Sequence, residues 1–244
     1  MPFANPDPDP VELAPLTRRS FLLAATALPL FGVVASAGAA PSPRKASFIA
    51  RGSDKSSQVA LTFHGAGDPA LTRRVLEITK KTKAPITVFA VGNWVEANHT
   101  LIRGLADAGH ELANHTYSHP ALRRLGRNAV AQEIAKGAAA LKAANGTIGT
   151  YFRPSGTPTP TDLMLQEAAK VGYATVVGYN VDPRDYQDPG SAAVVSRTLS
   201  GAKAGSIISL HLGHVGTVDA LEKIVGGLRN KGLEPVTVST LLHS

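Results

Sequence analysis

The most informative chemistry in the sequence lies in a short histidine motif. His115 and His119 are separated by three residues. Two neutral imidazoles at this spacing can converge on one metal ion, and the spacing is common in zinc sites. The motif differs from the metalloprotease pattern His-Glu-x-x-His because Thr116 stands in the glutamate position, and Pro120 disfavours a long helix. We predict that both histidines are metal ligands; the alternative is a pair of solvated loop histidines.

Other polar residues stand where apolar runs of the sequence end. These residues are His64, Arg153, Asp182, Asp185 and His211. In proteins built on parallel strands, functional residues gather at the carboxyl ends of those strands. Because several apolar runs end in such a polar residue, we predict that these residues form one shared site.

Each of these residues has a chemical and a structural interpretation. An imidazole at His211 can act as a general acid or base near neutral pH, or it can be a core histidine bonded to backbone. We expect Asp182 to orient His211; alternatively it caps the turn at Pro183. Arg153 either holds a catalytic carboxylate or forms a structural ion pair.

Aromatic side chains near the same motifs can stack on a sugar face, although such residues are as often part of the core. The candidates are Trp94, Tyr117 and Tyr186. The remaining histidines receive no role in this interpretation; they are His99, His110, His214 and His243.

Short apolar runs alternate with amphipathic segments along most of the chain. The predicted strands are Val59–Phe63, Ile86–Val91, Glu111–Ala113, Thr150–Phe152, Ala174–Val177, Ser206–Leu210 and Pro235–Val238. The predicted helices are Ala70–Lys83, Trp94–Ala108, Asn128–Ala144, Thr161–Val171, Ser191–Ala202 and Thr217–Lys231. Such alternation predicts an α/β fold with a parallel sheet, either a (β/α) barrel or an open doubly wound sheet.

The composition limits the possible chemistry. The chain has 244 residues, no cysteine and a formal net charge of +7. Without cysteine there is no thiol nucleophile, disulfide or iron–sulfur cluster, so a metal must rest on histidine and carboxylate ligands. The positive charge suggests an acidic partner such as nucleic acid, a membrane surface or an anionic cell-wall polymer. Nucleic acid is disfavoured because the basic residues are spread over the predicted helices without interleaved aromatics.

The N-terminal region resembles an export signal. An arginine pair, Arg18-Arg19, precedes a stretch without charged residues, Ser20–Pro43, which contains A-x-A cleavage sites after Ala37 and Ala39. This is the twin-arginine pattern. We expect a signal over 1–39, a linker over 40–56 and one domain over 57–244, in a secreted or cell-wall-associated protein. The alternative is a retained transmembrane anchor. Removal of the signal leaves 23 basic and 15 acidic residues, a net charge of +8.

Taken in order, the motifs resemble those of the NodB-homology polysaccharide deacetylases, carbohydrate esterase family four. The family's His-[Ser/Thr]-x-x-His motif matches 115–119, and its Arg-Pro segment matches 152–154. Its Asp-x-x-Asp-[Trp/Tyr] segment matches 182–186, and its Leu-x-His motif is placed on Ser209-Leu210-His211. The resemblance covers nearly all of 57–242. It implies a distorted (β/α)7 barrel and metal-assisted removal of acetyl groups, N-linked or O-linked, from a cell-wall or chitin-like polysaccharide.

The first motif departs from the family, which has Thr-Phe-Asp-Asp-Gly-Pro. An ungapped match places His64 at the family's base aspartate and Gly65 at its metal-ligating aspartate. In one arrangement His64 completes a three-histidine site and Asp68 is the base. In the other, which we prefer here, the turn at 65–67 swings Asp68 inward as the ligand and His64 is the base. A third possibility is a pseudoenzyme that binds sugar or metal without turnover.

The resemblance and the residues together give one expected mechanism. A divalent ion, which we expect to be zinc, is held by His115, His119 and Asp68. The expected catalytic residues are His64, Arg153, Asp182 and His211. Tyr186 and a backbone N–H near Gly156 are expected to bind substrate. In the family Arg153 pairs with the base aspartate, so here it should lower the pKa of His64. We expect a monomer acting on polysaccharide or peptidoglycan, with no membrane span after cleavage; an amidase for a different small amide is the alternative.

Overall fold

The computed structural model describes residues 45–243. The predicted export signal and the first part of the predicted linker lie outside the described residues. Within 45–243, no helix is both long enough and apolar enough to cross a membrane.

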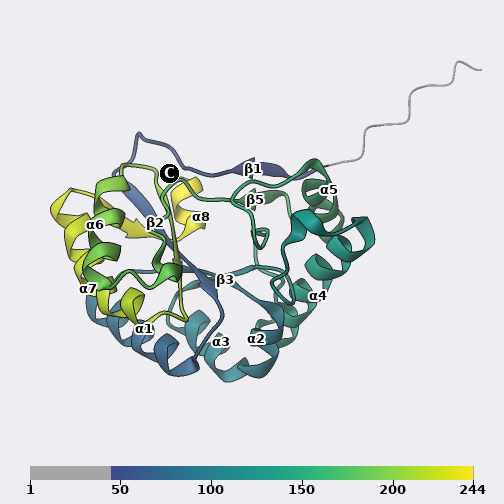
Figure 1. Ribbon diagram of the computed structural model, residues 1–244, viewed down its shortest axis with the longest axis horizontal. Helices are drawn as coiled ribbons and strands as arrows, with labels where there is room; N and C mark the ends of the chain where they lie inside the picture. Colours follow the sequence, from purple (N-terminus) through teal and green to yellow (C-terminus); the bar gives the residue numbers. More distant parts are fainter. Residues whose placement is uncertain (1–44, 244) are drawn as a thin grey trace, which may run out of the picture. The chain divides into compact units, whose positions relative to one another are not determined.

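Parallel strands form the centre of the fold (Figure 1). One sheet runs in the order β4 (Glu111–Asn114), β3 (Thr87–Ala90), β2 (Gln58–Gly65) and β6 (Ile207–His211), and β7 (Glu234–Val236) also pairs with β2. A second pair joins β1 (Ser47–Ile49) to β5 (Thr175–Val177). Single parallel bridges at Phe152 connect β4 to β5, and a bridge from Val181 to Ile208 returns to β6. The strands therefore close into an irregular barrel.

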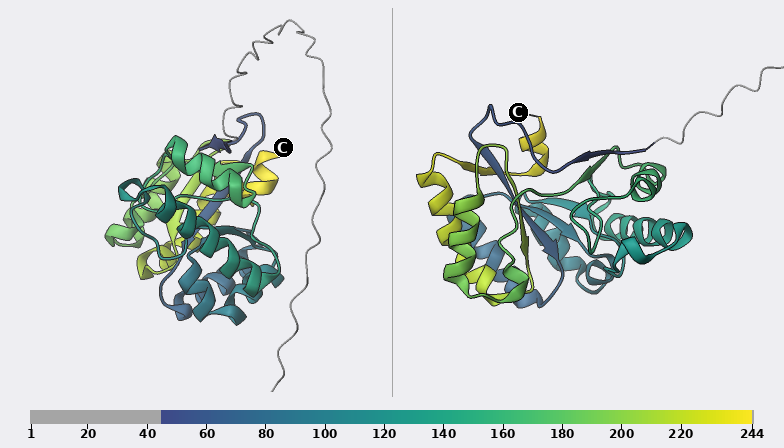
Figure 2. Two further views of the ribbon diagram at one scale, coloured as in Figure 1. Left: turned by 90° about the vertical axis from the view of Figure 1, so that its right-hand side faces the viewer. Right: turned by 45° about the horizontal axis from the view of Figure 1, so that its top comes forward.

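Helices cover much of the outside of these strands (Figures 1 and 2). They are α1 (Pro69–Thr82), α2 (Gly92–Ala97), α3 (His99–Asp107), α4 (Arg127–Asn145), α5 (Asp162–Val171), α6 (Ser191–Gly201), α7 (Val215–Asn230) and α8 (Val238–Leu242). Neighbouring helices pack on one another, as α7 does on α1 and α6, and α4 on α2, α3 and α5. Two short 3-10 helices, η1 (Leu122–Arg124) and η2 (Asp185–Gln187), lie in the loops.

The alternation of side chains along β2 divides the core into two layers. Val59, Leu61 and Phe63 belong to the hydrophobic cluster that the surrounding helices share. Ala60 belongs to a separate cluster with inward residues of the other strands and with α8. Because side chains of a strand alternate between its faces, Thr62 and His64 share the inner face with Ala60.

The same alternation places polar residues at one end of the barrel interior. In β6, Ile207 belongs to the inner cluster, so Ser209 and His211 follow it on that face. His64 and His211 are register partners across β2 and β6. Apolar residues thus fill one end of the interior, while imidazoles occupy the carboxyl end.

The structure differs from the predicted elements at several places. The predicted linker contains β1, whose backbone is bonded to Ala174 and whose strand pairs with β5, so the fold begins before residue 57. The predicted strand Thr150–Phe152 is reduced to bridges at Phe152. The predicted helix Trp94–Ala108 is split into α2 and α3 at Asn98, whose side-chain amide donates to the carbonyl of Trp94 at 2.8 Å.

Candidate functional site

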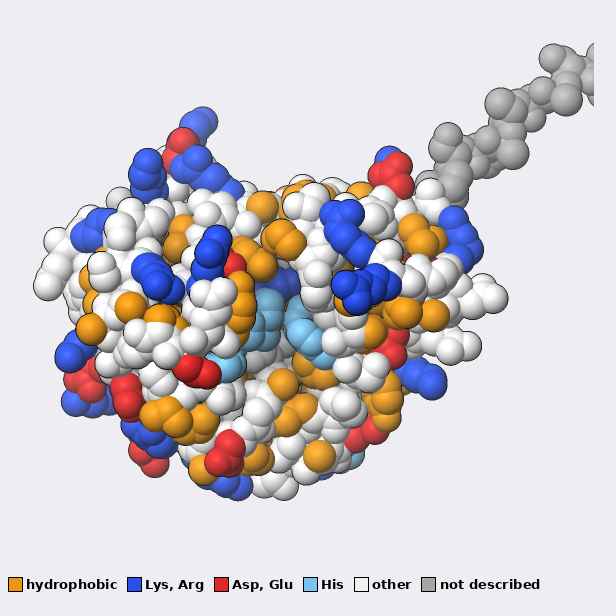
Figure 3. Space-filling model, viewed as in Figure 1, with side chains coloured by type: hydrophobic (Ala, Val, Ile, Leu, Met, Phe, Trp, Pro, Cys, Tyr) orange, Lys and Arg blue, Asp and Glu red, His pale blue; other side chains and the backbone are white. Residues whose placement is uncertain are grey.

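Three histidines converge at the carboxyl end of the barrel. His64 lies in β2, His115 directly follows β4, and His119 lies in the next loop. One ring nitrogen from each lies within 4.8 Å of the others. The ring centroids of His64 and His115 are 4.3 Å apart, and those of His115 and His119 are 4.8 Å apart. Figure 3 shows histidine side chains gathered in a hollow of the molecular face.

The loop that carries His119 is held in an unusual backbone conformation. Thr116 and His119 both have positive φ, 68° and 58°. Glu133 of α4 accepts hydrogen bonds from the backbone N–H groups of Tyr117 and Ser118, at 3.0 and 2.8 Å, and from the Ser118 hydroxyl. One carboxylate thus fixes the turn that brings His119 back towards His115.

The protonation pattern of His115 fits a metal ligand. Its Nδ1 donates to the backbone carbonyl of Arg153 at 2.8 Å, so its Nε2 carries the lone pair. That Nε2 is buried and has no hydrogen-bond partner. A buried nitrogen without a partner is costly, and a metal ion shared with His64 and His119 would satisfy it. The residues present therefore fit the metal that the resemblance implies.

Burial also keeps the three imidazoles in the form that binds metal. Burial, followed by the neighbouring His115 and Arg153, lowers the pKa of His64 well below its usual value. Burial likewise lowers the pKa of His115 well below the usual value, and it lowers the pKa of His119. Neutral imidazoles are the ligand form, so protons compete weakly for this site.

Asp68 does not join the histidines, which corrects the preferred third ligand. Its side chain caps α1 by accepting the backbone N–H of Ala70 at 2.8 Å, and it is exposed. The turn expected to swing it inward is packed: a Cβ at Gly67 would lie 2.4 Å from the Cα of Gly213. The third ligand position therefore falls to His64. The structure gives Asp68 no contact that supports a role as base.

His211 is oriented by Asp185 and not by Asp182. The Nδ1 of His211 donates to Oδ1 of Asp185 at 2.8 Å. The other carboxylate oxygen accepts the backbone N–H of His211 at 2.8 Å and the Thr217 hydroxyl at 2.6 Å. Asp182 is exposed and accepts the N–H of Arg184 at 2.8 Å, which is the turn-capping alternative. Asp185 is buried and fully bonded, so it fixes the His211 ring with Nε2 free for proton transfer.

Two adjoining cavities meet at the histidines. Their volumes are about 450 and 420 Å³, and both are lined by His64, His119 and His211. The first also reaches Asn93 and His214. The second reaches Gly156 and Tyr186, the two residues expected to bind substrate.

The three aromatic candidates differ in whether they reach the cavities. Tyr186 is 44% exposed, and its ring centroid lies 5.3 Å from that of His211. Trp94 is buried in the core and its indole N–H donates to the carbonyl of Gly67. The Tyr117 hydroxyl donates to Glu96. Of the three candidates, only Tyr186 lines the cavities at the histidines.

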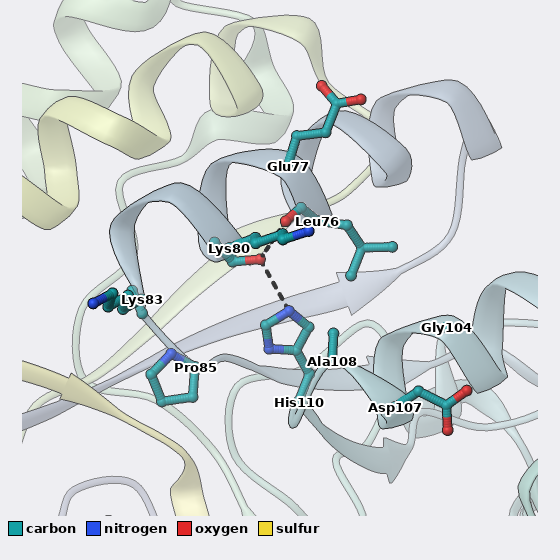
Figure 4. Close-up of a pocket in the computed structure, with 11 residues that line it drawn as sticks. Leu76, Glu77, Lys80, Lys83, Pro85, Gly104, Asp107, Ala108 and His110 are labelled. Carbon is teal, nitrogen blue, oxygen red and sulfur yellow. Dashed lines mark hydrogen bonds between the residues drawn. The ribbon is translucent and has the colours of Figure 1, made fainter.

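A cavity of about 710 Å³ lies between α1 and α3, beside the residues that precede β3 and β4 (Figure 4). It is therefore at the opposite end of the strands from the three histidines. His110 lies in it, with Nε2 bonded to Thr79 and Nδ1 accepting the N–H of Ile86. Both ring nitrogens have partners, which agrees with the structural interpretation of this histidine.

Comparisons with known proteins identify the family. The family model for polysaccharide deacetylase matches residues 51–176. A peptidoglycan-N-acetylglucosamine deacetylase from Bacillus cereus is 34% identical over 190 residues, covering 76% of this chain and 88% of that protein. A chitooligosaccharide deacetylase from Sinorhizobium fredii is 31% identical over 199 residues, covering 75% and 91%.

The chain belongs to the polysaccharide deacetylase family. The predicted family is thereby confirmed, and with it the predicted class of carbon–nitrogen hydrolases. Among solved structures, a CE4-family pseudoenzyme from Bacillus anthracis has a TM-score of 0.75 and 27% identity, covering 82% of this chain and 69% of that one. This match confirms the predicted α/β barrel class.

Gly65, which matches the family's metal-ligating aspartate in the ungapped comparison, does not face the histidines. It follows His64 in β2, so its side-chain direction is the outer face. A Cβ there would lie 2.7 Å from Cγ1 of Val88 and 3.0 Å from the Cα of Ala90 in β3. A side chain at this position needs β3 to move, so a residue without a side chain suits the close approach of β2 and β3.

Arg153 lacks the carboxylate partner that the family resemblance implies. Its guanidinium is buried and donates to the carbonyls of Val177 and Gly178 and to the hydroxyl of Thr62, at 2.9–3.0 Å. The guanidinium carbon lies 3.8 Å from the centroid of the Phe89 ring and 5.4 Å from that of the Tyr179 ring. Within residues 45–243 it forms no ion pair. Burial lowers the pKa of Arg153 to about 9.

Sequence reasoning missed two contributors to the site. Ser209 lies 3.3 Å from Nε2 of His64 through its hydroxyl. Its place two residues before His211 on a strand was the available signal, because alternate residues share a face. His214 lines a cavity at the site although it was given no role. The signal in the sequence was its position, three residues after His211.

The packing at Gly65 gives a stability prediction. Gly65→Ala should lower the free energy of unfolding by about 1–3 kcal/mol, because its methyl group would enter the space of Val88 and Ala90. Thermal unfolding of metal-free protein measures this. Gly226→Ala is the matched control: it is exposed in α7 with nothing within 4 Å, and it should be neutral or gain up to about 1 kcal/mol. Equal stability of Gly65→Ala and wild type would contradict the conclusion that a side chain at position 65 points to the outer face.

Proposed function

We propose that the chain is an exported deacetylase that removes N-acetyl groups from a peptidoglycan-type or chitin-type glycan with a zinc ion. The observation that carries this is the buried, unpartnered Nε2 of His115 in a three-histidine group where two cavities meet. The deacetylase relatives support the reaction and the substrate class. Removal of O-linked acetyl groups is a variant of the same chemistry.

His64, His115 and His119 would hold the ion. Three protein ligands leave an open position, as hydrolytic zinc sites require. When bound, zinc supplies a Lewis acid that polarises the acetyl carbonyl and acidifies water. A backbone N–H near Gly156, in the second cavity, is the candidate donor to the oxyanion.

His211 carries the proton transfers in this proposal. The two cavities are lined by no aspartate or glutamate among the described residues. Asp185 is buried behind His211 and bonded to its Nδ1. Nε2 of His211 is therefore the group that takes a proton from the attacking water and gives it to the leaving nitrogen. Asp185 keeps the ring in place and stabilises its protonated form.

The competing function is a pseudoenzyme that binds glycan without hydrolysis. The His64-Gly65 pair in place of two aspartates favours it, as does the likeness to a family pseudoenzyme. It predicts binding of chitotetraose with no acetate release when zinc, cobalt or nickel is supplied. An amidase for a different small amide would release acid from that amide and ignore oligosaccharides.

The ligand set is tested by metal content. Purified wild-type protein should bind one zinc ion per chain, as measured by mass spectrometry of metals after dialysis. His64→Ala should weaken zinc binding by at least the roughly 10–100-fold that loss of an outer partner costs.

Asp68→Ala is the control for the metal experiment, because its carboxylate caps α1. It should keep the zinc and lose about 1 kcal/mol of stability. If Asp68→Ala lost zinc and His64→Ala retained it, Asp68 and not His64 would be the third ligand.

The double role of His211 is tested with two substrates. His211→Ala should slow acetate release from chitotetraose and from 4-nitrophenyl acetate, each by about 10²–10⁴-fold, with zinc content unchanged. Nitrophenolate leaves without a proton, so an ester rate that survives in His211→Ala would show that His211 serves only as the acid.

Asp185→Asn should lower both rates, because the amide cannot stabilise the protonated ring in the same way. Asp182→Asn is the matched control, since the Asp182 carboxylate is exposed and accepts the backbone N–H of Arg184 in its own turn. It should keep both rates. A larger loss in Asp182→Asn than in Asp185→Asn would contradict the pairing.

Export is supported by the arginine pair and the small residues that follow it. Replacing both arginines, Arg18→Lys with Arg19→Lys, should retain the protein inside cells of a host that has the twin-arginine pathway. Mass spectrometry of the exported wild type should find a chain beginning at Gly38 or Ala40. An exported chain with residues 1–39 intact would favour the retained anchor.

A further inference from the structure

Two carboxylate–imidazole pairs lie next to each other at the site, and only one has been given a role. Asp185 binds His211, and Asp188 binds His214, each with 2.8 Å between Oδ1 and Nδ1. Both pairs span 26 residues in the sequence. The turn around η2 and the loop after β6 are thus joined by two hydrogen bonds of the same length. The His211 and His214 ring centroids are 5.8 Å apart.

The backbone around η2 is bent in a way that serves both pairs. Arg184, before η2, and Asp188, after it, have positive φ of 54° and 49°. This conformation is uncommon for residues other than glycine, although aspartate tolerates it better than most. Such strain persists where the surrounding structure requires it, and it concentrates at functional sites.

His214 is placed to contact a ligand. It lines the first cavity together with Asn93, Ser118 and His119. Its side chain is 26% exposed, whereas that of Asp188 is 69% exposed on the outer side of the pair. Because Nδ1 bonds to Asp188, Nε2 is the ring nitrogen left for a ligand. A sugar hydroxyl both donates and accepts hydrogen bonds, so it can pair with this nitrogen.

The position of the first cavity indicates which sugar unit would carry the hydroxyl group that His214 contacts. The two cavities share His64, His119 and His211, so the reacting acetyl group belongs at their junction. His214 lines the first cavity and not the second. A glycan with its reacting unit at the junction would place a neighbouring sugar unit in the first cavity.

We propose that His214, held by Asp188, binds a hydroxyl group of the sugar unit next to the one that loses its acetyl group. This inference rests on the proposed function. It makes His214 a substrate-binding residue that contributes to affinity for oligomers and has no part in the proton transfers.

The test separates binding from chemistry. His214→Ala should raise KM for chitotetraose about 3–10-fold, the effect of one hydrogen bond, with kcat nearly unchanged. The rate with 4-nitrophenyl acetate should stay at the wild-type value, because that substrate has no neighbouring sugar. Calorimetry with chitotetraose and metal-free protein should show the same weakening of Kd. An unchanged KM and Kd, or an equal loss with the ester, would overturn the inference.

Two further variants exclude a merely structural effect. His214→Gln keeps a hydrogen-bonding side chain and should recover part of the lost affinity. Asp188→Gly removes the carboxylate at a backbone position that glycine adopts without strain. It should raise KM while Tm is little changed. A normal KM in Asp188→Gly would show that the carboxylate does not position His214.

Failure of the proposed function has its own signature. Wild-type protein that neither binds nor hydrolyses chitotetraose would overturn both proposals. Wild-type protein that hydrolyses it, with His214→Ala indistinguishable from it, would overturn this inference alone. Wild-type protein that binds without hydrolysis would support the pseudoenzyme, and the calorimetry alone would then decide the role of His214.

Discussion

The geometry of the site depends on one backbone carbonyl, that of Arg153. It accepts the Nδ1–H of His115, so the lone pair of that ring is on Nε2, which is buried and has no hydrogen-bond partner. Arg153 is placed in turn by its own N–H bond to Asn114 at 2.9 Å. Its guanidinium ties Thr62 of β2 to Val177 and to the segment after β5. One residue therefore orients a metal ligand through its backbone and joins opposite parts of the barrel through its side chain.

The charge balance of the site follows from this arrangement. The guanidinium of Arg153 is buried among neutral acceptors, and the three candidate ligands are neutral imidazoles. A divalent ion held there would keep its full formal charge beside an unpaired cation. The family pattern of two aspartates would cancel much of that charge. A more positive site favours deprotonation of water and excludes a second proton on His64.

The sequence predicted the barrel and the histidine motif well, because both depend on local patterns. Alternating runs revealed most strands, and the spacing of His115 and His119 revealed two of the three candidate ligands. The choice between Asp182 and Asp185 was wrong because both follow the same strand, and only the folded turn decides which carboxylate meets His211. The preference for Asp68 was wrong because a side chain that looks available in sequence is bound to a helix end. β1 was missed because three residues are too few to show alternation.

Likeness to the family and the identity of the ligands are separate questions here. The family match rests on the barrel and on motifs spread over many residues, which can persist while a few site residues change. His64 and Gly65, which differ from the family motif in the ungapped match, are consistent with the strand around them: His64 faces the interior, and Gly65 lets β3 approach. A site that had merely lost its aspartates would not need a third imidazole within 4.8 Å of the other two. The inward position of His64 is therefore better explained by replacement of a ligand than by loss of the site.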